Sequence, residues 1–217
     1  MTYKMFLFLF ILLVPKLCAD TVINGFSSGN IILSAGSELF IENNTTTTLK
    51  NLTLTNLSAE RLVMGGIGST LALENVTVFL DGDYSFTQGH LYIHDDVNIC
   101  GTNSFAYQAA QQSYIAPFST LYFDVGSTFS YKPTVATRTL LSMNNETSRL
   151  YLNGCTLYST STGFRLDRGT VLFDNFVTLS ADGQVDSESI SFGESDNVVT
   201  EVLSAACVEI FGYVNFD

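Results

Sequence analysis

Basic residues are scarce in this chain of 217 residues, which has 9 Lys and Arg residues and 21 Asp and Glu residues. Two of the lysines, Lys4 and Lys16, lie in an N-terminal leader described below; without them, 7 basic residues face 21 acidic ones, a net charge of −14. Nucleic acids and anionic membrane surfaces are bound by clusters of Lys and Arg that neutralise phosphates. We therefore predict no nucleic-acid partner, and a polyanionic ligand only where a divalent cation bridges the like charges.

Cysteine is also scarce, and no C-x-x-C spacing occurs. Outside the leader only Cys100, Cys155 and Cys207 remain, which excludes a disulfide scaffold. We expect these residues to pack as small apolar side chains. An odd number in an exported chain leaves at least one free thiol or an intermolecular bond, and a pairing of Cys100 with Cys155 stays open.

Helical periodicity is missing after the leader, and only "FAYQAAQQSY" (105–114) is expected to form a helical turn or two. Motifs of several enzyme classes are missing as well. The chain has no G-x-S-x-G, no P-loop, no zinc motif and no Arg-x-Lys.

The first 19 residues have the layout of a secretory signal peptide. Lys4 precedes an apolar run over residues 6–14, and "KLCAD" places cleavage after Ala19. We therefore predict a secreted, periplasmic or cell-surface protein with one domain over residues 20–217 and no membrane span after cleavage. A retained anchor is the first alternative, although the run is short for a bilayer. Lipidation of Cys18 is the second, although Lys16 and Leu17 stand where small residues are expected.

A pattern of apolar-x-apolar-x-(Asn/Asp) recurs along the chain. Its copies are "LFIEN" at 39, "LTLTN" at 52, "LALEN" at 71, "LYIHD" at 91 and "VLFDN" at 171, with degenerate copies "LYFDV" at 121 and "LYLNG" at 150. From Leu52 onward the intervals are 19, 20, 30, 29 and 21 residues. This predicts a unit of about 20 residues, with two units enlarged by insertions near 102–118 and 132–147.

Alternating apolar residues predict strands with one buried face, and a repeat of whole strand–bend–strand units predicts a solenoid rather than a sandwich. The predicted fold is all-β, a right-handed parallel β-helix of seven to eight coils in which equivalent residues stack. The first predicted stack contains Leu52, Leu71, Leu91, Leu121 and Leu150. The second contains Leu54, Leu73, Ile93, Phe123, Leu152 and Phe173.

The Asn or Asp that ends each unit tolerates a left-handed bend, and its side chain can bond to the turn or to the next coil. Asn56, Asn75, Asp95 and Asn175 are therefore predicted to form a ladder. In these "LxLxN" frames the chain resembles right-handed parallel β-helix proteins of the pectin-lyase-like superfamily, which have comparable Asn ladders. "GGIG" at Gly65 is similar to the repeats of polymorphic outer-membrane autotransporter passengers, although the partner repeats of that family are irregular here.

"GHLYIHDDVNI" (89–99) holds both histidines and two adjacent aspartates. With Leu91 and Ile93 inward, His90, Tyr92 and His94 point outward on one strand. The two histidines are then about 13 Å apart, too far to share one metal ion. His94, Asp95 and Asp96 remain weak candidates for catalysis. "GTVLFDNFVTL" (169–179) repeats the frame without either histidine, which assigns Asp95 to the turn ladder.

Asp81 and Asp83, around Gly82, form an acidic turn that is a candidate for calcium, although no EF-hand or RTX spacing supports it. We predict no other cofactor.

Hydrolysis of a polysaccharide needs two carboxylates at a set separation. The residue set of polygalacturonases is not reproduced, and Arg165 and Arg168, with Asp167 between them, are predicted to form surface ion pairs. The expected function is therefore non-catalytic: adhesion, or an envelope role, with a cell-surface glycan or protein as partner. The alternative is a carbohydrate-active enzyme, a hydrolase or lyase, that uses the acidic residues between Asp81 and Asp96.

Two further features concern the surface. The N-x-(S/T) sequons are interpreted as structural, apart from the exposed stretch 43–51; they stand at Asn43, Asn44, Asn51, Asn56, Asn75 and Asn145. "FGYVNFD" (211–217) is predicted to be another strand rather than a polar cap, so we expect an incomplete domain or a coil end that self-associates.

Overall fold

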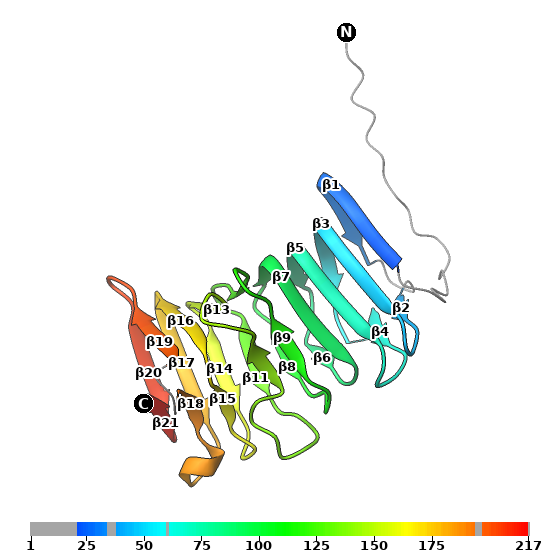
Figure 1. Cartoon of the computed structure of the whole chain (residues 1–217). Coiled ribbons are helices and arrows are strands. Elements are labelled where there is room, and N and C mark those ends of the chain that lie inside the picture. Colours follow the sequence, from blue (N-terminus) through cyan, green and yellow to red (C-terminus); the bar gives the residue numbers. More distant parts are fainter. Residues whose placement is uncertain (1–20, 34–37, 60, 194–196, 217) are drawn as a thin grey trace.

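The computed structural model describes residues 21–33, 38–59, 61–193 and 197–216, so the predicted signal peptide lies outside the described residues. Over these ranges the chain forms 21 strands and one 3₁₀ turn (Asp186–Glu188), with no α-helix. All strand pairs are parallel, and they build a β-solenoid of about eight coils (Figure 1). The predicted parallel β-helix is confirmed. Nowhere in the described ranges does a helix reach the length and apolar character of a membrane span.

Each coil has three sides, here called A, B and C in chain order. Four long strands form sides A and B of the first coils: β1 (Thr21–Ile32), β3 (Thr46–Leu57), β5 (Thr70–Leu80) and β7 (His90–Cys100). Side A continues as β9 (Ser113–Ile115), β12 (Leu141–Met143), β15 (Phe164–Leu166), β18 (Ile190–Phe192) and β21 (Val214–Phe216). Side B continues as β10 (Thr120–Phe123), β13 (Arg149–Asn153), β16 (Gly169–Asp174) and β19 (Val198–Val202).

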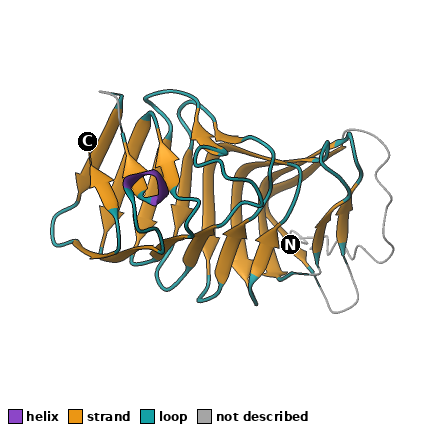
Figure 2. Cartoon of the chain, turned by 90° about the horizontal axis from the view of Figure 1, so that it is seen from below, coloured by secondary structure: helices purple, strands orange, loops and turns teal. Residues whose placement is uncertain are grey.

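Side C contains one short strand from each coil. These are β2 (Leu39–Ile41), β4 (Leu62–Met64), β6 (Tyr84–Phe86), β8 (Ser104–Tyr107), β11 (Thr128–Tyr131), β14 (Thr156–Ser159), β17 (Phe176–Ala181) and β20 (Cys207–Phe211). Loops connect the sides along the edges of the solenoid, and the single 3₁₀ turn lies among them (Figure 2).

The coils average about 24 residues, longer than the predicted 20. The repeated frames belong to different sides, which explains the error: Leu52 lies on side B and Leu71 on side A, so the step between them is not one coil. The predicted insertion at 102–118 is wrong, because it holds the regular strands β8 and β9, and these also replace the helical turn expected at 105–114. Residues 132–140 do lengthen one coil, since Ser113 pairs with Leu141.

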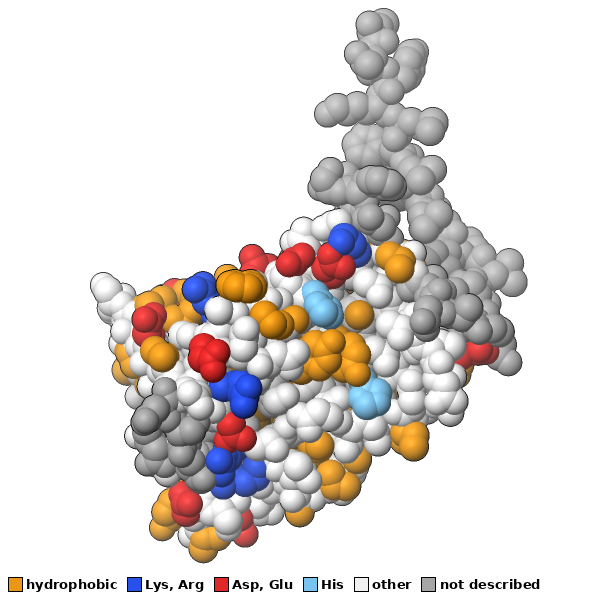
Figure 3. Space-filling model, in the orientation of Figure 1, with side chains coloured by type: hydrophobic (Ala, Val, Ile, Leu, Met, Phe, Trp, Pro, Cys, Tyr) orange, Lys and Arg blue, Asp and Glu red, His pale blue; other side chains and the backbone are white. Residues whose placement is uncertain are grey.

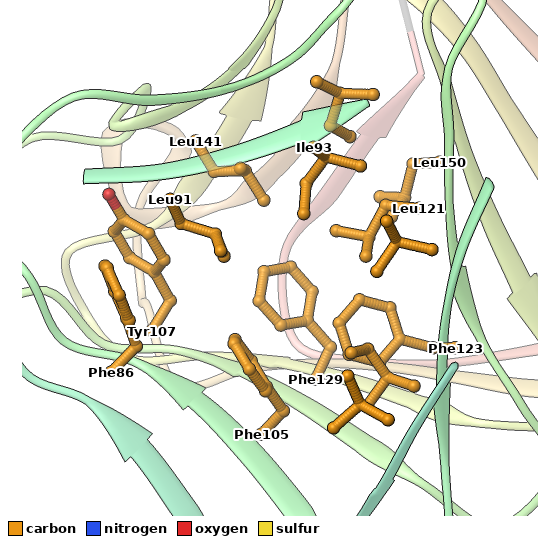
Figure 4. Close-up of a cluster of buried hydrophobic side chains, with 14 of the residues drawn as sticks. Phe86, Leu91, Ile93, Phe105, Tyr107, Leu121, Phe123, Phe129, Leu141 and Leu150 are labelled. Atoms are coloured by element: carbon orange, nitrogen blue, oxygen red, sulfur yellow. The ribbon is translucent and has the colours of Figure 1, made fainter. Parts of the chain in front are cut away.

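The core is a continuous column of apolar side chains that all three sides contribute (Figure 4). The predicted pairs Leu71–Leu91 and Leu73–Ile93 are confirmed on side A. The side-B part of both predicted stacks is also confirmed, in the registers Leu121–Leu150 and Phe123–Leu152–Phe173, and Val171 extends the first of them.

The predicted stacks fail at two places. Leu52 and Leu54 pair with Val76 and Val78 rather than with Leu71 and Leu73. Leu121 pairs with Val97 rather than with Leu91. In both cases the prediction joined a side-A residue to a side-B residue, because the two sides share one alternating pattern.

The predicted bends are confirmed in their backbone. Asn56, Asn75, Asp95 and Asn175 all have positive φ, between 52° and 62°. The single predicted ladder is corrected to two. At the corner of sides A and B the Asn75 amide donates to Asn51 Oδ1 at 2.9 Å, so Asn51 takes the place predicted for Asn56.

The second ladder lies at the end of side B, where the chain turns into side C. There the Asn175 amide donates to Asn153 Oδ1 at 2.6 Å, and the Asn153 amide donates to Asp124 Oδ1 at 2.8 Å. Bonds of this kind fix neighbouring coils in register.

Asn75→Val should lower the free energy of unfolding by about 2 kcal/mol. A β-branched residue is strained at a φ of 52°, and the bond to Asn51 is lost. Asn75→Gly is the control, because it keeps the backbone conformation and loses only the side-chain bond. Urea denaturation of both variants separates the two effects. Equal losses would contradict a role for the left-handed bend.

Two other predictions concern the cysteines and the last coil. Cys100, Cys155 and Cys207 are free thiols, and only Cys155 is buried as expected.

Strands β19 to β21 and their connections leave large apolar side chains between 44 and 59% exposed: Val199, Val202, Ile210, Phe211, Tyr213 and Phe216. Self-association through this coil stays a prediction.

Candidate functional site

Two tyrosines from neighbouring coils stack on the outer surface of side A. In β7, Leu91 and Ile93 are buried, so the alternating backbone turns Tyr92 outward. Strand β9 pairs with β7 in a register that sets Tyr114 directly beside Tyr92. Their ring centroids are 4.1 Å apart and their planes differ by 26°.

The two histidines flank this pair. The ring centroids of His90 and Tyr92 are 5.9 Å apart. The His94 ring lies nearly perpendicular to the Tyr114 ring, with centroids 6.0 Å apart. His90 Nδ1 lies 2.7 Å from the carbonyl oxygen of Gln112, so this nitrogen donates and the ring is held in place. We call His90, Tyr92, His94 and Tyr114 the aromatic platform; Figure 3 shows it as a hydrophobic patch between the two pale-blue histidines.

A shallow polar hollow of about 350 Å³ continues side A beyond the platform. Tyr114 pairs in register with Ser142, which lines the hollow. Gln112, also in its wall, donates from Nε2 to Ser142 Oγ at 3.1 Å and to the carbonyl oxygen of Thr139 at 2.8 Å. The remaining lining residues are Thr139, Met143, Asn144, Arg165, Asp167 and Arg168.

The charges in the hollow are partly neutralised by one another. Arg165 Nε donates to Asp167, which confirms the predicted ion pair for Arg165. Arg168 Nη1 donates to the carbonyl oxygen of Asn144 at 3.3 Å. The hollow therefore offers guanidinium, amide and hydroxyl donors together with a carboxylate acceptor.

Partial burial and the neighbouring Tyr92 raise the pKa of the Tyr114 hydroxyl. A raised pKa keeps this phenol protonated beyond the usual range, so the platform retains a hydrogen-bond donor in mildly alkaline solution.

The sequence cluster at 90–96 is divided by the fold. His94 belongs to side A and contacts Tyr114. Asp95 and Asp96 lie at the corner with side B, where both are exposed. The Asp95 backbone N–H donates to Ser119 Oγ at 2.9 Å, and its φ of 53° confirms that Asp95 forms the bend.

Asp81 and Asp83 lie at the other end of side B. Asp83 accepts from the Ser104 backbone N–H at 2.8 Å, and Asp81 lies 3.7 Å from Arg61 Nη1. The bend at Asp95 lies beside the bend at Asn75 on the neighbouring coil. The segment of β5 between Asn75 and Asp81 is roughly 17 Å long, farther than the separation of paired glycosidase carboxylates. No group of three or more His, Cys, Asp or Glu suited to a metal occurs in the described ranges. Calcium at Asp81 and Asp83 stays a prediction.

The sequence reasoning missed Tyr114, which it placed in a helical turn. A signal was available, because "YI" at 92–93 is repeated as "YI" at 114–115. The two Tyr-Ile pairs are the ones that the β7–β9 register brings together.

Comparison of the chain with models of known families, with curated proteins and with solved structures finds no match. The geometry of side A is therefore what supports a function.

Proposed function

We propose that the protein is an exported, non-catalytic module that binds a glycan on side A. The observation that carries this proposal is the stacked, outward-facing pair of Tyr92 and Tyr114. A sugar ring has apolar C–H faces and polar hydroxyl edges, so it is recognised by an aromatic surface with hydrogen-bond groups around it. Tyr92 and Tyr114 supply the aromatic surface. The two histidines and the hollow supply the hydrogen-bond groups around it.

The solenoid suits this role because it holds the contact residues rigidly. Both tyrosines stand on paired strands above buried residues, Ile93 and Ile115, with no exposed surface. A surface on strands is positioned more accurately than one on loops, and it loses little side-chain entropy when a ligand binds.

The charge distribution favours a neutral glycan. In the hollow Arg165 is paired with Asp167, and Arg168, which donates to the carbonyl oxygen of Asn144, is left as a single cation without a carboxylate partner among the described residues. One guanidinium is too little charge to select a polyanion. The predicted mature charge of −14 also opposes the approach of a polyanion.

Tyr114→Ala should lower the affinity for a bound neutral oligosaccharide by about tenfold, which is about 1.4 kcal/mol. Tyr92→Ala should have a similar effect, because either change leaves one unstacked ring. The ligand is chosen on an array of neutral oligosaccharides, and the affinities are measured by titration calorimetry.

Tyr122→Ala is the matched control. Tyr122 and Tyr151 are also neighbours in register, with ring centroids 5.0 Å apart, but on side B. Equal losses in Tyr114→Ala and Tyr122→Ala would contradict a site on side A, and so would an array without any bound glycan. Release of reducing sugar from the bound ligand would contradict a non-catalytic role.

A further inference from the structure

Phe118 combines a left-handed backbone conformation with an almost fully exposed aromatic ring, and neither feature is needed to build the solenoid. It stands in the turn Ala116–Ser119 between β9 and β10, closed by a bond from the Ser119 N–H to the Ala116 carbonyl oxygen. Its φ is +59°, and 82% of its surface is exposed, the largest fraction for any large apolar residue of the described ranges.

Glycine is the residue that such a turn favours. Residues Asp124–Ser127 form a turn with the same bond, and Gly126 stands there with a φ of +82° at the place that corresponds to Phe118. A bulky residue is strained in this region, and an exposed ring adds no packing to compensate. A strained backbone conformation that brings no gain in stability is typical of a residue kept for function.

Carboxylates lie on both coils next to Phe118. On one side Asp96 pairs in register with Thr120, and the Asp95 N–H bonds to Ser119. On the other side the Phe118 N–H donates to Thr147 Oγ1 at 2.9 Å. Glu146, which precedes Thr147 in the chain, is exposed. The exposed Arg149 pairs in register with Thr120 on that second coil, so the corner holds three carboxylates and one guanidinium. We call Asp95, Asp96, Phe118 and Glu146 the acidic corner, because its carboxylates outnumber this one cation.

We propose that the acidic corner docks a protein partner whose contact segment combines Lys or Arg with apolar side chains. Phe118 is the anchor that packs against the apolar side chains, and the carboxylates pair with the basic ones. An aromatic centre within a charged border is the usual arrangement of an interface hot spot, and charge complementarity speeds association. The same carboxylates repel an anionic membrane surface, into which an exposed aromatic ring could otherwise insert. This docking is separate from glycan binding. It gives Asp95 a role besides the bend, and it gives the exposed Asp96 a role of its own.

The probe is a phage-displayed library of random 12-residue peptides, selected on the wild-type protein. We expect the enriched peptides to carry net positive charge together with Leu or aromatic residues. Phe118→Gly should weaken their binding at least tenfold, as measured by fluorescence anisotropy. Asp95→Asn and Asp96→Asn should weaken it severalfold, and added salt should reduce these losses. Ile67→Ala, which changes another exposed apolar turn residue (64% exposed), should bind as the wild type does.

Stability and glycan binding distinguish docking from a structural role. Phe118→Gly should raise Tm by about 2–4 °C, because the turn loses its strain. It should leave glycan affinity unchanged, since Phe118 lies outside the platform. A lower Tm in Phe118→Gly would overturn the proposal, because Phe118 would then serve the fold. A library without enriched peptides, or enriched peptides without positive charge, would overturn it as well.

Discussion

Phe123→Ala should lower the free energy of unfolding by about 3–5 kcal/mol. The Phe123 side chain has no exposed surface and stacks on Phe129 with ring centroids 4.7 Å apart. Phe105 meets it edge-on at 6.2 Å from the coil before. Removal of the ring leaves a cavity between sides B and C that the fixed spacing of the coils cannot close. A loss of this size is a large part of the stability of an ordinary domain.

The control is Tyr122→Ala, one residue away on the same strand. Tyr122 points outward and loses only its ring contact with Tyr151, so we expect a change of about 1 kcal/mol or less. Urea denaturation measures both variants. Hydrogen exchange should show that Phe123→Ala weakens β10, β11 and β13 more than β3, because each coil contacts only its neighbours. Similar losses in the two variants would contradict the assignment of inner and outer faces.

The fold could be predicted from the sequence because its signals are local. Alternating side chains mark strands wherever one face is buried, and Asn or Asp marks a left-handed bend wherever it occurs. Both signals act within five residues, as in "LALEN" at 71–75. The structure confirms them at Leu71, Leu73 and Asn75.

The assignment of strands to sides could not be predicted in the same way. Sides A and B show the same alternation, so nothing in "LTLTN" (52–56) and "LALEN" (71–75) tells that they lie on different sides. Register depends on contacts between residues 20 or more positions apart, for example Tyr92 with Tyr114. Such contacts are fixed by the lengths of the loops between strands, and in the sequence this one is marked only by the repeated Tyr-Ile at 92–93 and 114–115.

The candidate site shows the same limit. The sequence grouped His94, Asp95 and Asp96 because they are adjacent, yet the left-handed bend at Asp95 separates them onto two surfaces. His94 joins Tyr114 on side A, and the aspartates join the corner that holds Phe118. Adjacency in the chain therefore predicted a single cluster where the fold builds two surfaces with different chemistry.

The stability of the fold should fall steeply above pH 9 to 10. Burial raises the pKa of Tyr107 from 10.0 to about 12 and the pKa of the Cys155 thiol from 9.0 to about 12. Burial also raises the pKa values of Tyr84 and Tyr131. Each group then keeps its proton in the folded state at a pH where the unfolded chain has lost it. The stabilisation is complete below the unfolded pKa and disappears as the pH rises toward the folded pKa.

The expected slope is about 1.4 kcal/mol of lost stability per pH unit for each group that is charged only in the unfolded chain. Urea denaturation at several pH values between 8 and 11 measures it. High salt throughout suppresses repulsion between surface carboxylates, which would otherwise add to the effect.

Tyr84→Phe separates the buried phenols from other causes of alkaline unfolding. The Tyr84 hydroxyl is buried and has no hydrogen-bond partner, so its removal should raise stability at pH 8 by about 1–3 kcal/mol. The same change removes one group that ionises only on unfolding. The loss of stability per pH unit above pH 10 should therefore be smaller by about 1.4 kcal/mol. An unchanged slope together with the gain at pH 8 would show that Tyr84 does not contribute to the alkaline limit. Cys155→Ala should flatten the curve at lower pH, between 9 and 10, because the unfolded thiol ionises before the phenols.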